Sequence, residues 1–275
     1  MDNNDKRIAV LIDADNVSPK YIKAVLDEIA NHGIPTYKRI YGDWTRPQMS
    51  TWKEVSLEYS ISPIQQYSHT TGKNSTDSAL IIDAMDILYS QNVDGFCIVS
   101  SDSDFTRLAA RLREAGMLVL GMGEKKTPRP FVVACEKFKY LEALLSGSAG
   151  DGDAAADTET SVKGGDDLRD LIVSIQTIVT DISDEEGWAS LGGVGNMLNK
   201  RFPDFDTRNY GFSKLTNLVK SLNAFDIESR KIGNTPHASQ TFIRNRQLPK
   251  KKPTSRGGRG RSRYAAKDTG EQDTD

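Results

Sequence analysis

The chain has 275 residues, of which 37% are hydrophobic, so it can bury a substantial core and has room for about two domains. The net charge is −2 in residues 1–146, −4 in 147–166, zero in 167–247 and +4 in 248–275. This composition excludes a wholly disordered chain, and two cysteines, Cys97 and Cys135, cannot supply a disulfide framework. The first five residues are polar and acidic, and no apolar run approaches the roughly 20 residues of a membrane span, so we expect a soluble cytoplasmic protein.

Short apolar runs alternate with amphipathic helical patterns from residue 8 to about residue 140. This alternation predicts an α/β domain with a doubly wound parallel sheet. Strands are expected at 8–12, 34–40, 61–67, 96–99 and 117–122. The first helix is expected to have Ser18 as its N-cap and Pro19 at its first position, and to stop at Gly33. Further helices are expected at 52–57, 76–89 and 105–112.

The composition changes twice in the second half of the chain. Residues 146–166 are small and acidic without apolar periodicity, which indicates a flexible linker between a first domain (1–145) and a second. Helical periodicity predicts helices at 168–182, 191–202 and 213–222, followed by extended segments at 225–228 and 241–244. Three helices and a closing hairpin predict a small winged-helix domain at 167–247. The tail, 248–275, is basic and Gly-rich, and we expect it to be disordered when free.

Acidic side chains follow two of the predicted strands at the point where each strand ends. The run 8–12 leads into Asp13, and the run 96–99 is soon followed by Asp102 and Asp104. Ligands in such sheets bind beyond the carboxyl ends of the strands, so these side chains should gather in one crevice. Carboxylates that gather repel one another and persist mainly where a hard cation such as Mg²⁺ neutralises them. The sequence therefore predicts metal-dependent chemistry on phosphate esters.

The individual acidic residues have alternative explanations. Asp13 is the strongest candidate because the apolar run ends on it, although capping a turn would also explain an aspartate there. Asn16 is as well suited to making a turn as to serving the site. Asp15 is expected to face solvent. Asp13 and Asn16 therefore define the first part of the predicted site.

A second part comes from the helix at 76–89 and from the turn after 96–99. Asp77 shares a face with the apolar residues of its helix, so we place it in the site, although an acidic residue also stabilises a helix N-terminus. Asp83 is a possible supporting residue. Either Asp102 or Asp104 could be a helix N-cap, but one helix cannot use both. The predicted ligands of one or two divalent ions are Asp13, Asp77, Asp102 and Asp104.

If the strands are parallel, the loops that follow them meet at the same edge of the sheet. They contain aromatic and cationic residues, which suit a single-stranded nucleic acid because its bases stack and its phosphates need positive charge. The alternative is a set of solvated loop residues. The candidates are Tyr41, Trp44, Arg46, Tyr67, His69, Thr71, Lys73, Lys125, Lys126 and Arg129.

The first domain contains three ordered motifs: Leu11-Ile12-Asp13-x-x-Asn16, Lys73-x-x-x-Asp77-x-x-Leu80-x-x-Asp83-Ala84 and Val99-Ser100-Ser101-Asp102-Ser103-Asp104-Phe105. Together they resemble the NYN domain family. Members of this family are relatives of PIN nucleases with a Rossmann-like fold, and they cut RNA using acidic residues around Mg²⁺ or Mn²⁺. The resemblance covers roughly residues 6–145. It implies an acidic pocket formed by Asp13, Asn16, Asp77, Asp102 and Asp104.

The second domain contains three motifs: Gly187-Trp188-Ala189-x-Leu191, Leu198-x-x-x-Phe202-Pro203-Asp204-Phe205-Asp206 and Asn209-Tyr210-Gly211-Phe212-x-Lys214-Leu215. Together they resemble the OST-HTH (LOTUS) family, which is associated with RNA binding and recurs after NYN domains in bacterial proteins. We expect its aromatic residues (Trp188, Phe202, Phe205 and Tyr210) to belong to the core. The expected RNA contacts are Lys200, Arg201, Arg208, Lys214 and Lys220, for which a solvated helix face is the alternative.

The leading functional hypothesis is a metal-dependent ribonuclease, expected to be an endonuclease, whose second domain and basic tail hold single-stranded RNA. A second hypothesis is an RNA-binding regulator whose carboxylate pocket does not cut. A third takes Asp13-Ala14-Asp15 as the nucleophile motif of haloacid-dehalogenase-like phosphatases, in which Asp13 attacks phosphate and Asp15 is the acid or base. The apparatus for nucleic acid binding favours the first two.

Overall fold

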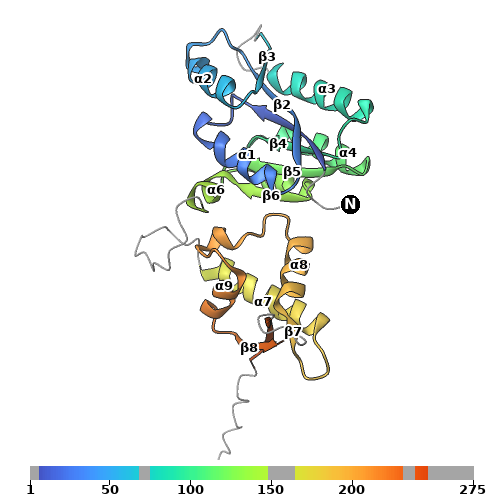
Figure 1. Ribbon diagram of the computed structural model, residues 1–275, viewed down its shortest axis with the longest axis vertical. Helices are drawn as coiled ribbons and strands as arrows, with labels where there is room; N and C mark the ends of the chain where they lie inside the picture. Colours follow the sequence, from blue (N-terminus) through green and yellow to red (C-terminus); the bar gives the residue numbers. More distant parts are fainter. Residues whose placement is uncertain (1–5, 68–74, 148–164, 232–238, 247–275) are drawn as a thin grey trace, which may run out of the picture. The chain divides into compact units, whose positions relative to one another are not determined.

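The computed structural model describes residues 6–67, 75–147, 165–231 and 239–246 (Figure 1). The expected basic tail, most of the expected linker, and His69, Thr71 and Lys73 lie outside the described residues. None of the helices in the described ranges is long and apolar enough to cross a membrane.

The first domain is built on a six-stranded sheet in which every neighbouring pair of strands is parallel. The strand order is β3-β2-β1-β4-β5-β6. The first five strands confirm the predicted ones, whereas the short edge strand β6 was not predicted. Only four residues long, β6 alternates lysine with an aromatic residue and so lacks an apolar run. The strands are β1 (Arg7–Asp13), β2 (Ile34–Gly42), β3 (Ser62–Gln65), β4 (Gly95–Val99), β5 (Leu118–Gly123) and β6 (Lys137–Tyr140).

The helices of the first domain follow the predicted order, with two short additions near its end. They are α1 (Ile22–Ala30), α2 (Thr51–Glu58), α3 (Ser75–Ser90), α4 (Thr106–Glu114), α5 (Arg129–Ala134) and α6 (Leu141–Gly147). The expected cap at Ser18 is wrong in detail, because the Ser18 side chain makes no capping hydrogen bond. Pro19 instead opens a 3-10 turn, η1 (Pro19–Tyr21), that precedes α1.

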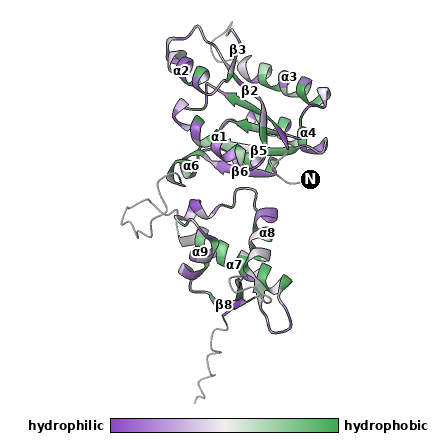
Figure 2. Cartoon of the chain, in the orientation of Figure 1, coloured by the Kyte–Doolittle hydropathy of each residue, from purple (hydrophilic) through white to green (hydrophobic). Residues whose placement is uncertain are grey.

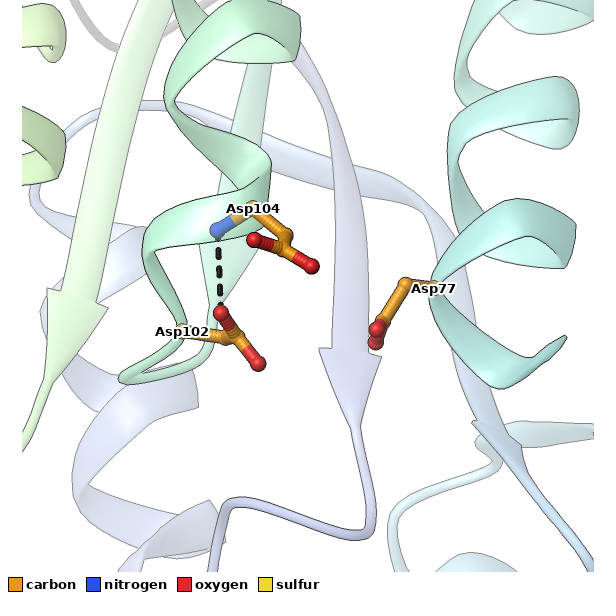
Figure 3. A group of neighbouring side chains, drawn as sticks. All are labelled: Asp77, Asp102 and Asp104. Atoms are coloured by element: carbon orange, nitrogen blue, oxygen red, sulfur yellow. Dashed lines mark hydrogen bonds between the residues drawn. The ribbon is translucent and has the colours of Figure 1, made fainter. Parts of the chain in front are cut away.

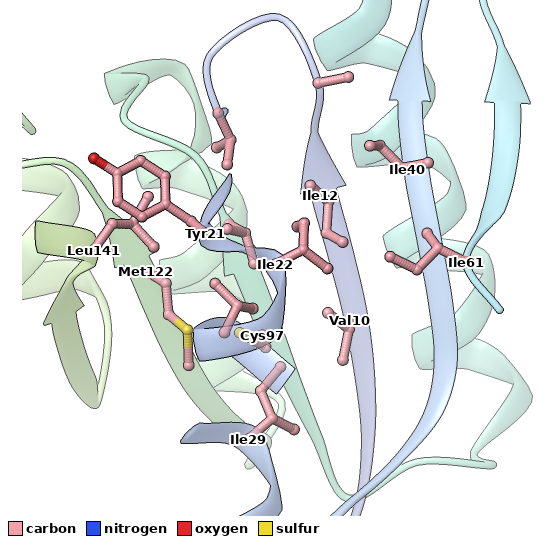
Figure 4. Close-up of a cluster of buried hydrophobic side chains, with 14 of the residues drawn as sticks. Val10, Ile12, Tyr21, Ile22, Ile29, Ile40, Ile61, Cys97, Met122 and Leu141 are labelled. Atoms are coloured by element: carbon pink, nitrogen blue, oxygen red, sulfur yellow. The ribbon is translucent and has the colours of Figure 1, made fainter. Parts of the chain in front are cut away.

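Side chains of each strand alternate between two cores, one on each face of the sheet. Val10 and Ile12 of β1 pack with residues of α1 in one core (Figure 4), whereas Ala9 and Leu11 pack with residues of α3 and α4 in the other. Figure 2 shows the hydrophobic strands inside the domain. Asp13 has the same parity as Ala9 and Leu11. The strand therefore directs the Asp13 side chain toward the face that α3 and α4 cover.

The second domain contains three helices and a small antiparallel sheet, which confirms the expected helices and hairpin. The helices are α7 (Gly165–Ile182), α8 (Leu191–Arg201) and α9 (Leu215–Ser221), with a 3-10 turn, η4 (Thr207–Tyr210). The sheet has the order β7-β9-β8, from β7 (Ala189–Ser190), β8 (Phe225–Lys231) and β9 (Ser239–Asn245). Its buried core includes Ile175, Val194, Leu198, Leu218 and Ile243.

The close packing of β5 against the following segment is testable at Gly121. A Cβ atom at this position would lie 2.5 Å from the Cys135 Sγ atom and from the Phe138 ring, both of which are fully buried. We expect Gly121→Ala to lower the free energy of unfolding by about 1–3 kcal/mol, because overpacking forces neighbours to move. Urea denaturation measures this change. Gly42→Ala is the control, since the nearest atom to its new Cβ would be the Ala14 Cβ atom, 3.2 Å away. An equal loss of unfolding free energy in both variants would contradict the explanation.

Candidate functional site

Three aspartates from two separate elements converge at the carboxyl end of the sheet. Asp77, Asp102 and Asp104 each offer one carboxylate oxygen, and these oxygens all lie within 4.8 Å of one another (Figure 3). Asp77 comes from α3, and the other two come from the turn between β4 and α4. The predicted convergence of these three residues is therefore present in the structure.

The turn after β4 is shaped by its own aspartates. Asp102 occupies the N-cap position of the 3-10 turn η3 (Ser103–Phe105), and its Oδ1 atom accepts a hydrogen bond from the Asp104 backbone N–H at 2.9 Å. This bond fixes the turn so that both carboxylates face Asp77, as Figure 3 shows. The cap and the candidate ligand are thus the same residue.

Asp77 is buried in the first turn of α3, on the helix face that packs on the sheet. Burial, as the largest cause, and the negative charges of Asp13, Asp102 and Asp104 together raise the pKa of its carboxyl to about 6. Each of these causes opposes the ionised form, and a divalent cation would offset them all. Three hard oxygen donors at this spacing fit Mg²⁺ or Mn²⁺.

Asp13 lies beside these three residues, although it is not a member of their group. It is fully buried, and its carboxylate accepts hydrogen bonds from the Ser100 hydroxyl at 2.7 Å, the Asn16 side-chain amide at 2.8 Å and the Asp15 backbone N–H at 3.1 Å. Burial is the largest influence on its pKa, which is raised. Asn16 thus supports Asp13 and contributes to the turn at the same time.

Ser100 is a functional candidate that the sequence prediction did not single out. Its hydroxyl donates to Asp13 and also accepts a hydrogen bond from the Asp102 backbone N–H at 3.0 Å. The alternation along β4 provides a signal, because Ser100 continues the parity of Phe96 and Ile98 and so faces the same side as Asp13. Ser100 therefore connects the two chain segments that carry the acidic residues.

Asp15 does more than face solvent. Its carboxylate accepts a hydrogen bond from the Thr76 hydroxyl at 3.0 Å and lies 3.8 Å from the Arg46 guanidinium. Thr76 is the residue before Asp77, so Asp15 ties the loop after β1 to the start of α3. Asp15 is exposed, which confirms the expectation that it faces solvent, and these contacts add a structural role.

The loop after β2 is held by Asp43, which is buried. Asp43 accepts hydrogen bonds from the Thr45 hydroxyl at 2.6 Å and the Gln65 side-chain amide at 3.0 Å, and lies 3.6 Å from the Arg46 guanidinium. Trp44 donates its indole N–H to the Ile64 carbonyl at 3.0 Å. These contacts hold the loop that carries Arg46, and Arg46 lies next to Asp15 at the edge of the acidic site.

The remaining predicted RNA contacts in the first domain differ in their exposure. Tyr41 is fully buried, so it cannot stack on a base; its hydroxyl donates to Asp83 instead. Tyr67, Lys125, Lys126 and Arg129 are exposed.

In the second domain, Lys200, Arg201, Lys214 and Lys220 are exposed. Arg201 pairs with Asp181 at 2.7 Å, and half-buried Arg208 pairs with Asp206 at the same distance.

The aromatic residues of the second domain divide into two groups. Phe205 is buried, and Phe202 and Tyr210 pack against the core as expected. Trp188 is half-buried and lies instead under the guanidinium groups of Arg244 and Arg230, at 4.6 and 5.1 Å from its ring centre. Cation–π stacking, rather than core packing, is therefore the main environment of Trp188.

Comparisons with known proteins match both parts of the chain. Residues 7–142 match the family model of the NYN domain, and residues 165–237 match that of the OST-HTH/LOTUS domain. A crystal structure of a protein of unknown function from Vibrio parahaemolyticus is 18% identical over 50% of this chain and 93% of its own, with a TM-score of 0.42. A solution NMR structure of an uncharacterized protein from Nitrosomonas europaea is 28% identical over 36% of this chain and 95% of its own, with a TM-score of 0.26. No curated protein matches the chain.

The raised pKa of Asp77 predicts how metal affinity depends on pH. The folded protein holds a proton on Asp77 up to about pH 6, against a reference value of 3.8, so a cation must displace that proton below pH 6. We expect the Kd for Mn²⁺ to be level above pH 7 and to rise about tenfold for each pH unit below 6. Without metal, stability should fall as pH rises from about 4 to 6, because the folded state binds the proton more tightly.

Isothermal titration calorimetry between pH 5 and 8 measures the Kd, and urea denaturation without metal measures the stability. A Kd that stays constant from pH 7 to pH 5 would show that no protonated carboxyl competes with the cation.

Proposed function

Since the chain combines an NYN domain with an OST-HTH/LOTUS domain, we propose that it is a metal-dependent ribonuclease that cleaves single-stranded RNA internally. The observation that carries this proposal is the group of three carboxylate oxygens from Asp77, Asp102 and Asp104 within 4.8 Å of one another. These residues would hold Mg²⁺ or Mn²⁺, which when bound supplies an activated water and offsets negative charge on the phosphodiester.

The residues around the three carboxylates have distinct tasks in this proposal. Asp13 is the fourth acid of the site, since its charge acts on Asp77. Asn16 and Ser100 orient the Asp13 carboxylate through their hydrogen bonds. The Asp102 cap keeps Asp104 directed toward Asp77. Preorganised charge of this kind costs no rearrangement when the substrate arrives.

RNA would be held by cations on both domains. Arg46 lies at the edge of the acidic site, where it can exchange part of its contact with Asp15 and Asp43 for a substrate phosphate. The proposed contacts include the exposed cations Lys125, Lys126 and Arg129 of the first domain and Lys200, Arg201, Lys214 and Lys220 of the second. His69 and Lys73, outside the described residues, remain proposed contacts, as does half-buried Trp44. Half-buried Arg208 is the weakest of the set because Asp206 already pairs with it.

One observation favours a second candidate, an RNA-binding regulator that does not cut. Both oxygens of Asp13 already accept hydrogen bonds from the protein, which leaves three carboxylates rather than four for a cation. Asp13 is also fully buried, which disfavours the phosphatase hypothesis, because a nucleophilic Asp13 would need access to its substrate. Cleavage by Asp15→Ala compared with Asp77→Ala separates the nuclease from the phosphatase, which requires Asp15.

Cleavage of single-stranded RNA in Mg²⁺ or Mn²⁺ tests the proposal directly. We expect Asp77→Asn, Asp102→Asn and Asp104→Asn each to reduce the cleavage rate by about a hundredfold or more, because each removes charge at the reacting centre. Asp13→Asn should also impair cleavage. Asp86→Asn is the matched control, since it removes a carboxylate from the exposed side of the same helix, α3.

Labelled RNA resolved on denaturing gels gives the rates, and gel-shift titration gives RNA affinity. Binding without metal-dependent products in the parent protein would favour the regulator. Cleavage by Asp13→Asn at the parental rate would remove Asp13 from the machinery.

The proposed phosphate contact of Arg46 predicts a change in salt dependence. We expect Arg46→Ala to weaken RNA binding and to make the plot of log affinity against log salt shallower by about 0.7, the value for one phosphate of a single strand. Arg111→Ala is the control, because exposed Arg111 lies in the last turn of α4, away from the acidic residues that precede this helix. An unchanged slope in Arg46→Ala would show that Arg46 does not contact phosphate.

A further inference from the structure

Helix α3 and strand β2 are joined by three polar side chains. The Asp83 carboxylate of α3 accepts a hydrogen bond from the Tyr41 hydroxyl and pairs with the Arg39 guanidinium. Tyr41 is fully buried, and Asp83 and Arg39 are largely covered, with side-chain exposures of 20% and 30%. We call these three residues the α3 clamp. Their burial makes the clamp a feature of the domain interior, where polar groups need partners.

The strand pattern explains why the clamp forms. Arg39 and Tyr41 are two residues apart on β2, so both side chains project from the same face of the sheet. This is the face that α3 covers, because Tyr41 packs in the core that contains Leu80 and Ala84 of this helix. Burial raises the pKa of Tyr41, and its bond to Asp83 does so further, which keeps the hydroxyl protonated as a donor.

The clamp lies close to the acidic site in the sheet and in the helix. Tyr41 is the residue of β2 that pairs with Asp13 of β1 in the ladder. Asp83 follows Asp77 by six residues, which is about 9 Å along a helix. The clamp therefore fixes α3 against the strand position beside Asp13, within two helical turns of Asp77.

Apolar packing alone does not determine where Asp77 lies. Contacts of Leu80 and Ala84 hold α3 on the sheet, but such contacts are not directional and permit small shifts along the helix axis. Directed hydrogen bonds at two points limit these shifts: Thr76 to Asp15 beside Asp77, and the clamp further along. The distance between Asp77 and the pair Asp102 and Asp104 depends on this placement.

We propose that Asp83 is a positioning residue. Through Tyr41 and Arg39 it fixes the position of α3 along the helix axis relative to β2, and so holds Asp77 at ligand distance from Asp102 and Asp104. This inference rests on the proposed function, because it assumes that the three aspartates bind a divalent cation. Asp83 itself does not touch the cation. Its role accounts for a largely covered charged group that the three-aspartate site does not use.

The test measures Mn²⁺ binding to the full chain by calorimetry in Asp83→Asn and Tyr41→Phe. Both variants should weaken Mn²⁺ binding by about tenfold, the lower end of the loss seen when residues that orient metal ligands are changed. Tyr41→Phe is the sharper variant, because it removes one anchor of the clamp without changing any charge. Circular dichroism establishes that each variant is folded at the temperature of the titration.

Asp86→Asn is the matched control, since it removes an exposed carboxylate from the same helix. Its effect on Mn²⁺ affinity should stay below about twofold, because salt screens exposed charges. A second readout is rescue by metal. Excess Mn²⁺ should restore cleavage in Asp83→Asn and Tyr41→Phe, since their ligands are present but misplaced, and should not restore it in Asp77→Ala.

The outcomes separate this inference from the proposed function. If the parent binds Mn²⁺ and both folded clamp variants bind it equally well, the positioning role is wrong while the nuclease proposal stands. If Asp83→Asn does not fold, Tyr41→Phe decides alone. If the parent chain binds no Mn²⁺, the proposed function fails, and this inference fails with it.

Discussion

Repulsion among carboxylates at the carboxyl end of the sheet is the constraint on which the site depends. Asp77, Asp102 and Asp104 lie close enough for the charges of the others to raise the pKa of Asp77, with burial as the larger cause. Such a grouping is costly unless a cation offsets it, so the domain must hold the three residues together by other means. It does so with the cap formed by Asp102 and with the apolar and polar contacts of α3. The surrounding structure thus counteracts the repulsion among the three carboxylates, which the proposed chemistry requires to lie close together.

Much of the fold followed from the sequence because its signals were strong and local. Five strands had long apolar runs or clear turn boundaries, and the periodicity of 168–182 was sufficient to predict α7. The misses have physical reasons. Strand β6 has lysines at alternate positions and lies at the edge of the sheet. Ser18 has the extended backbone of an N-cap residue, but its side chain makes no capping hydrogen bond. Neither property can be inferred from residue type alone, because each depends on what the segment meets in three dimensions.

The site was predictable where helix and strand periodicity determine direction. The face of Asp77 followed from its spacing to Leu80 and Ala84, which are buried as that spacing requires. Tyr41 was misplaced among RNA contacts because residues at the end of a strand look like loop residues in sequence; its burial depends on α3, far along the chain. The pairing of Asp15 with Thr76 was missed for a similar reason, since hydrogen bonds between distant segments leave no local pattern. Ser100 was missed although the alternation along β4 indicates its direction.

The position of the acidic group within the strand order has a consequence for assembly. Strands β1 and β4 are neighbours at the centre of the sheet; β2 and β3 follow on the β1 side, and β5 and β6 follow on the β4 side. At such a reversal of strand order α/β sheets commonly form a crevice. Asp13 and Asp77 precede β4 in the chain, and Asp102 and Asp104 follow it. Neither half of the domain can therefore assemble the centre by itself. During synthesis the nascent protein would lack the complete acidic group until the second half had emerged and docked, which ties any activity to the finished domain.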